Sequence, residues 1–141
     1  MAKITVDEFQ KLMADELPWA AENGMRLHRI EHGKATMILP FSGNMLRPGG
    51  TVSGPALMTT ADCALYVAIL SELGPVKLAV TTSLTINFLR RPSADCDVIG
   101  QCRLMKIGKR LVVGEVYLYS EGHEDPVAHV VGTYSVPPRN K

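Results

Sequence analysis

Hydrophobic positions near the start of this 141-residue chain recur every three or four residues, the period of an amphipathic helix. Thr5 and Glu8 stand just before them at the spacing of a capping box, in which each residue satisfies a free backbone N–H of the other. We therefore predict a helix over residues 5–15, and Pro18 should end it. The recurring hydrophobic positions are Phe9, Leu12, Met13 and Leu17.

A second helix is predicted from Gly54 to Leu70, and it is apolar on nearly every side. A helix without a polar face belongs in the interior of a domain. Residues 40–53 are rich in Gly, Pro, Ser and Asn and predict a loop that leads into this helix. The Gly74-Pro75 pair marks its end.

The other segments alternate between apolar and polar residues, which predicts β-strands. A hairpin turn is expected at His32-Gly33, and short turns join the later strands. One antiparallel sheet of about five to six strands can wrap a buried helix, so we expect an α+β fold in a single domain over residues 1–141. The predicted strands are residues 24–31, 34–39, 77–89, 97–106, 110–120 and 127–136.

Overall charge and cysteine content narrow the function. The chain has 15 basic and 14 acidic residues, and this balance argues against a nucleic-acid partner. Cys63, Cys96 and Cys102 form no Cys-x-x-Cys pair, as expected of a reduced, cytoplasmic chain. No signal-peptide core is visible, and Asp62 interrupts the longest apolar run, so we expect neither export nor a membrane partner.

Metal and nucleotide motifs are missing from the sequence. The four histidines are not at the spacing of zinc ligands, so we expect no metal. The Pro48-Gly49-Gly50 segment has neither the Gly-Lys-Ser/Thr ending of a P-loop nor the spacing of a dinucleotide fingerprint, so neither ATP nor NAD is expected.

Asp62 is the most unusual residue, because it lies in the middle of the apolar helix. An ionised carboxylate is costly to bury, so at such a position it is usually paired or used in chemistry. The alternative is a structural role, in which Asp62 faces a solvent groove or caps a neighbouring turn.

Gly54-Pro55 offers a partner for such chemistry. Proline is tolerated at the first turn of a helix, and the Gly54 N–H there can bind a carbonyl oxygen at the positive end of the helix dipole. Asp62 lies eight residues later, roughly 12 Å along the helix. If both groups act on one carbonyl, Asp62 must come from a second copy of the chain, and the site lies at a dimer interface. Alternatively, Gly54-Pro55 is only a helix start.

The segment from Ser53-Gly54-Pro55 to Ala61-Asp62, followed by residues 81–92, resembles the hotdog-fold thioesterases of the phenylacetate-degradation (PaaI-like) group. The likeness extends over roughly residues 24–136. In that family, the amide of the glycine that opens the central helix polarises a thioester carbonyl. An Asp or Glu eight residues later attacks this carbonyl or activates water. The resemblance gives these roles to Gly54 and Asp62.

The resemblance also implies that Thr81 positions the attacking group, although the Thr-Thr-Ser run leaves the register open by one residue. Ser53 stands where the family has histidine, next to the substrate, and Pro55 replaces a second glycine. Basic residues near strand ends often bind the phosphates of coenzyme A in this family. Those residues would be Arg90, Arg91, Lys109 and Arg110.

From the resemblance we expect an acyl-CoA thioesterase that releases a free acid and CoA. It would need no cofactor beyond the CoA of its substrate, and it would act as a homodimer or a dimer of dimers. One alternative is a non-catalytic acyl-CoA binding or sensing protein, which the changes at Ser53 and Pro55 favour. The other is a hotdog hydratase, but no histidine closely follows Asp62 as such a site would require.

Overall fold

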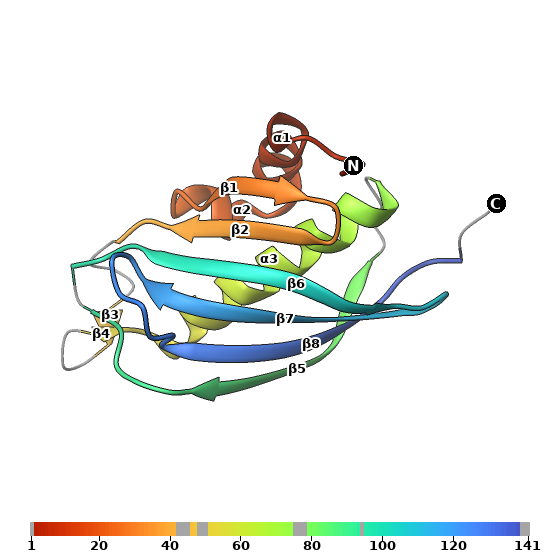
Figure 1. Cartoon of the computed structure of the whole chain (residues 1–141). Helices are drawn as coiled ribbons and strands as arrows, with labels where there is room; N and C mark the ends of the chain where they lie inside the picture. Colours follow the sequence, from red (N-terminus) through yellow and green to blue (C-terminus); the bar gives the residue numbers. More distant parts are fainter. Residues whose placement is uncertain (1, 42–45, 48–50, 75–78, 94, 139–141) are drawn as a thin grey trace.

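A six-stranded antiparallel sheet curls around one long helix, α3 (Gly54–Leu73), as Figure 1 shows. The computed structural model describes residues 2–41, 46–47, 51–74, 79–93 and 95–138. The predicted α+β architecture is confirmed. In spatial order the strands are β1 (Arg26–Glu31), β2 (Lys34–Leu39), β6 (Val98–Ile107), β7 (Leu111–Ser120), β8 (Ala128–Ser135) and β5 (Val80–Phe88).

The N-terminal helix forms as the capping box predicts. Helix α1 runs Val6–Glu16, the Glu8 N–H donates to Thr5 Oγ1 at 3.1 Å, and the Thr5 N–H donates to Glu8 Oε1 at 3.0 Å. A second short helix, α2 (Pro18–Glu22), follows at once and was not predicted. Pro18 ends one helix and begins the next, because a residue at the first helical position needs no N–H partner.

The expected loop over residues 40–53 contains two short strands that sequence periodicity did not indicate. Strands β3 (Leu46–Arg47) and β4 (Thr51–Val52) pair with each other in a separate two-stranded sheet. Two residues are too few for an alternating pattern to be recognised. Residues 42–45 and 48–50 of the loop lie outside the described residues, as do residues 77–78 of the strand predicted over 77–89.

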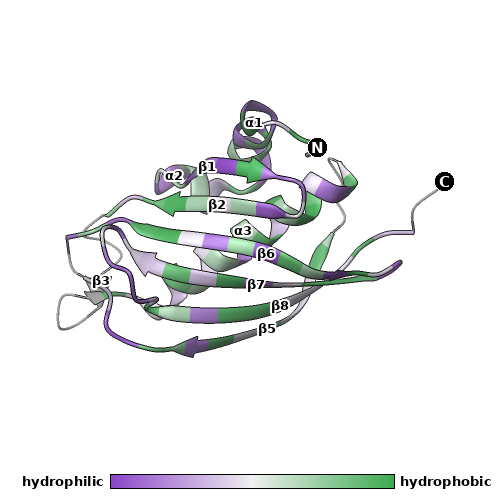
Figure 2. Ribbon diagram, viewed as in Figure 1, coloured by the Kyte–Doolittle hydropathy of each residue, from purple (hydrophilic) through white to green (hydrophobic). Residues whose placement is uncertain are grey.

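Helix α3 is the centre of the core. In Figure 2 the strands alternate between hydrophilic and hydrophobic residues, as expected of a sheet with one face on a core. By length and hydropathy α3 could also cross a membrane, but 72% of the relevant window is buried inside the protein.

A pair of glycines lets α3 lie close against two strands of the sheet. Gly114 on β7 and Gly132 on β8 lie opposite each other, and the buried Leu65 packs onto both. A Cβ atom at Gly132 would overlap Leu65 Cδ1 and would lie 2.9 Å from Leu84 Cδ1. Glycine at these positions therefore lets the two strands touch the helix.

Replacing Gly132 with alanine should test this packing. The added methyl group has no free volume beside the buried Leu65, so we expect Gly132→Ala to lower the free energy of unfolding by about 1–3 kcal/mol. Denaturant titration measures the change. The control is Ser135→Ala, at a half-buried position on the other face of β8. Equal stability of Gly132→Ala and wild type would show that the contact is looser than described.

Candidate active site

The first half of the site is the N-terminus of α3. Ser53 is its N-cap, and Ser53 Oγ accepts a hydrogen bond from the Ala56 N–H at 3.3 Å. Pro55 has no N–H, and the Gly54 N–H has no hydrogen-bond partner among the described residues. A donor is thus available at the positive end of the helix, where it can bind a carbonyl oxygen.

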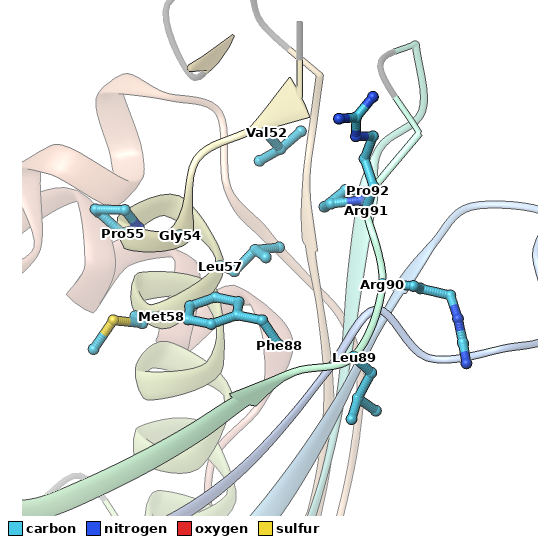
Figure 3. Close-up of a pocket in the computed structure, with 10 residues that line it drawn as sticks. All are labelled: Val52, Gly54, Pro55, Leu57, Met58, Phe88, Leu89, Arg90, Arg91 and Pro92. Carbon is cyan, nitrogen blue, oxygen red and sulfur yellow. The ribbon is translucent and has the colours of Figure 1, made fainter. Parts of the chain in front are cut away.

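Gly54 lines an open cavity of about 700 Å³, drawn in Figure 3. Pro55, Met58 and Phe88 give the cavity an apolar wall near the helix, and two arginines stand at the end of β5. The Arg90 side chain extends away from the helix, and its Nη1 donates to the Pro126 carbonyl at 3.0 Å. An apolar wall with nearby cations suits a ligand with an apolar part and an anionic part.

The second half of the site is Asp62, whose carboxylate is firmly held. Asp62 Oδ1 accepts a hydrogen bond from Thr81 Oγ1 at 2.8 Å and from the Tyr134 hydroxyl at 2.6 Å. Asp62 is only partly buried, although the preceding Ala61 is fully buried. It lines a cavity of about 320 Å³ together with Cys63 and both of its hydroxyl partners. The carboxylate is therefore both partnered and accessible from a cavity.

Thr81 reaches Asp62 because of an irregularity in β5. The register between β5 and β8 shifts between Thr81 and Ser83, as at a β-bulge. Thr81 then meets Asp62, whereas Thr82 Oγ1 donates to the Thr133 carbonyl at 3.1 Å. Within the Thr-Thr-Ser run, the structure places Thr81 beside the carboxylate.

Tyr134 is a site residue that the sequence analysis missed. Its side chain is 4% exposed, and its ring stacks on Tyr66 with centroids 6.2 Å apart. Burial and the negative charge of Asp62 raise the pKa of Tyr134, so its hydroxyl stays protonated and can donate. The signal in the sequence is weak, because Tyr134 looks like any inward residue of an alternating strand.

Cys63 lies next to Asp62 and lines the same cavity, so it is a second potential nucleophile. Burial raises the pKa of its thiol to about 12, with a smaller contribution from the Asp62 charge. The thiolate, and not the thiol, is the reactive form. At neutral pH Asp62 is therefore the better nucleophile or base of the two.

Gly54 and Asp62 line two separate cavities at opposite ends of β5. Gly54 lies against Phe88 at the end of the strand: a Cβ atom at Gly54 would be 3.1 Å from Phe88 Cζ. Asp62 accepts a hydrogen bond from Thr81 near the beginning of the strand. The cavity that Gly54 lines does not include Asp62, and the cavity that Asp62 lines does not include Gly54. One chain thus carries two half-sites.

The four basic residues predicted to bind CoA lie in two pairs at opposite ends of the sheet. Arg90 and Arg91 line the cavity of Gly54. Lys109 and Arg110 lie at the turn between β6 and β7, and the Arg110 carbonyl accepts from the Val136 N–H at 2.8 Å. That turn is at the end of the sheet where Tyr134 and Asp62 meet. Neither Lys109 nor Arg110 lines either half-site.

Residues 49–127 match the thioesterase superfamily. The solved structure of a protein from Silicibacter sp. TM1040, assigned as a thioesterase, has a TM-score of 0.89 and 38% identity and covers 98% of this chain and 95% of that one. A variant of the phenylacetic acid degradation protein PaaI from Thermus thermophilus has a TM-score of 0.76 and 25% identity, covering 85% and 99%.

A protein of Thermoplasma volcanium assigned as an esterase is 32% identical over 90 residues. That alignment covers 64% of this chain and 66% of the relative, just under two thirds of its length. Both solved structures share the overall fold of this chain. The chain belongs to the thioesterase superfamily, and it has the hotdog fold of the PaaI-like proteins.

Proposed function

We propose that this protein is an acyl-CoA thioesterase that acts as a homodimer. The observation that carries the proposal is the position of the Asp62 carboxylate. It lines a cavity, and one of its oxygens accepts hydrogen bonds from two hydroxyl groups. Hydrolysis of a thioester needs a nucleophile or base and a donor for the developing oxyanion. Asp62 and the Gly54 N–H are groups of these two kinds.

The exposed edge of the sheet supports a dimer. Strand β5 is an edge strand, and its exposed apolar side chains include Val80, at 56% exposure, and Phe88, at 55%. Unpaired strand edges readily accept another strand. If β5 pairs antiparallel with β5 of a second copy, the beginning of each strand lies opposite the end of the other.

This pairing joins the two half-sites. Asp62 is hydrogen-bonded to Thr81 near the beginning of β5, and Gly54 lies against Phe88 at the end of the same strand. A two-fold axis near the middle of β5 therefore brings Asp62 toward Gly54 of the partner subunit, and the symmetry produces this site twice. The separation of roughly 12 Å along one helix then no longer prevents cooperation.

In the proposed reaction, the thioester oxygen binds the Gly54 N–H of the partner subunit at the positive end of α3. Asp62 then acts in one of two ways. Its carboxylate attacks the carbonyl carbon, CoA leaves as a thiolate, and water hydrolyses the resulting acyl–aspartyl anhydride. Alternatively, Asp62 takes a proton from water, the hydroxide adds to the carbonyl, and the same thiolate leaves.

The basic residues support CoA as the leaving group. Arg91 is exposed at the mouth of the larger cavity, and guanidinium groups bind phosphates through charge-assisted hydrogen bonds. In the proposed dimer, the end of the sheet that carries Lys109 and Arg110 approaches the partner's Arg91.

Replacing Asp62 should remove activity without unfolding the protein. We expect Asp62→Asn to lower kcat by about 100-fold or more, because an amide neither attacks a thioester nor accepts a proton. Release of free thiol from short, medium, long and aryl acyl-CoAs provides the assay. Asp15→Asn, an exposed carboxylate on α1, is the control.

Wild-type rates for Asp62→Asn would contradict the mechanism. If wild type binds acyl-CoA but releases no thiol, the result would instead favour a non-catalytic acyl-CoA binding or sensing protein.

Heterodimers should reveal whether the site is shared. Gly54→Pro removes the N–H donor, and the extended Ser53 backbone, with ψ at 151°, accepts a following proline at the helix start. Alone, Gly54→Pro and Asp62→Asn should each be inactive. A heterodimer of the two, purified through two different tags, contains one intact site and should show about half of the wild-type activity. A heterodimer as inactive as either parent would place each site within one chain.

Arg91 should act on CoA and not on the acyl group. We expect Arg91→Ala to raise KM for an acyl-CoA about tenfold, with little change in kcat, because a phosphate loses a charge-assisted contact. An acyl-pantetheine thioester lacks the nucleotide phosphates, and its KM should not change. Arg29→Ala, on the outer face of the sheet, is the control with the same loss of charge. An equal effect on both substrates would contradict a role in binding the CoA phosphates.

A further inference from the structure

Two hydroxyls converge on a single oxygen of Asp62. Thr81 Oγ1 and the Tyr134 hydroxyl both donate to Oδ1, at 2.8 and 2.6 Å. Among the described residues, none forms a hydrogen bond to Oδ2. The two oxygens of one carboxylate are thus unequal: Oδ1 is anchored, and Oδ2 is available to a reactant.

Of the two donors, Tyr134 is the one that the core holds in place. It lies on β8, an internal strand, whereas Thr81 lies at the bulge of the edge strand β5. The Tyr134 ring stacks on Tyr66 at an interplanar angle of 17°, and Phe9 of α1 meets Tyr66 edge-on at 6.2 Å. A chain of three packed rings therefore fixes the hydroxyl against α3.

We propose that Tyr134 is a positioning residue, which holds Oδ1 of Asp62 so that Oδ2 faces the thioester or the attacking water. This inference rests on the proposed function. Without the Tyr134 hydroxyl, Asp62 keeps its place in α3 but gains rotational freedom about its side-chain bonds. Small displacements of a reacting group lower the rate even when substrate binding is unchanged.

Tyr134 acts through Asp62 and donates no proton to the substrate. Its hydroxyl hydrogen is engaged by Asp62 Oδ1, and the Asp62 backbone carbonyl lies 3.1 Å from the same hydroxyl. The raised pKa of Tyr134 keeps this hydrogen in place at neutral pH. The expected effect of removing the hydroxyl is therefore on kcat and not on KM.

The first test compares Tyr134→Phe with Tyr119→Phe. Both lose one hydroxyl, but Tyr119 lies on the other face of the sheet, since the adjacent Leu118 is in the core. With the preferred acyl-CoA, we expect Tyr134→Phe to lower kcat about 10- to 100-fold, with KM within about threefold of wild type. Tyr119→Phe should match wild type. Unchanged kcat for Tyr134→Phe, or a loss confined to KM, would overturn the inference.

The second test separates positioning from a contribution to the fold. Tyr134→Phe is made in the wild-type background and in Asp62→Ala, where the hydroxyl has no carboxylate to hold. A hydroxyl that acts on the Asp62 carboxylate lowers Tm more when it is removed from wild type than when it is removed from Asp62→Ala, where only its contact with the backbone carbonyl of residue 62 remains. An equal fall of Tm in both backgrounds would show that the hydroxyl serves the fold and would overturn the inference.

Failure of this inference and failure of the proposed function give different results. If wild type hydrolyses acyl-CoA, Asp62→Asn does not, and Tyr134→Phe keeps full kcat, then the thioesterase stands and the role of Tyr134 is wrong. If wild type hydrolyses no acyl-CoA in the panel, the proposed function fails, and the catalytic role of Tyr134 fails with it.

Discussion

The close approach of α3 to strands β7 and β8 is the constraint on which the site depends. Leu65 packs onto the paired glycines Gly114 and Gly132, where the Cβ atom of a larger residue would overlap the Leu65 methyl groups. Asp62 is three residues before Leu65 and lies on the same side of the helix. Tyr134 is two residues after Gly132 and faces the same side of the strand. The glycine contact therefore brings Asp62 within hydrogen-bond distance of Tyr134.

This arrangement explains how a carboxylate is accommodated in an otherwise apolar helix. Two hydroxyl donors satisfy one oxygen of Asp62, so the residue is neither an isolated buried charge nor a freely moving surface group. The neighbouring Cys63 thiol, in contrast, has its pKa raised by burial. In one short segment of helix, the surroundings thus hold a carboxylate at a cavity and keep the neighbouring thiol protonated.

The sequence indicated those parts of the protein that depend on local chemistry. The capping box of α1, the apolar helix after Gly54 and the alternating strands all follow from nearby residues, and their predicted fold is confirmed. Asp62 was recognisable because a charge in an apolar run is unusual. The short strands β3 and β4 and the helix α2 were missed, because a few residues cannot show a period.

Tyr134 was missed for another reason. Its role depends on the register between β8 and β5 and on the side of α3 that meets β8, and both are set by contacts between residues far apart in the sequence. The choice between Thr81 and Thr82 depends likewise on a bulge in β5. The proposed reactive group and the choice of Thr81 as its partner could thus be inferred from the sequence, whereas Tyr134 and the register of the Thr-Thr-Ser run needed the structure.

The central claim is that one site is built from two subunits. A crystal structure of the protein with a non-hydrolysable acyl-CoA analogue would measure it directly. We expect the carbonyl oxygen of the analogue to lie about 3 Å from the Gly54 amide of one subunit, with Asp62 Oδ2 of the other subunit facing the carbonyl carbon. An analogue bound between Gly54 and Asp62 of the same chain, or away from both, would contradict this account.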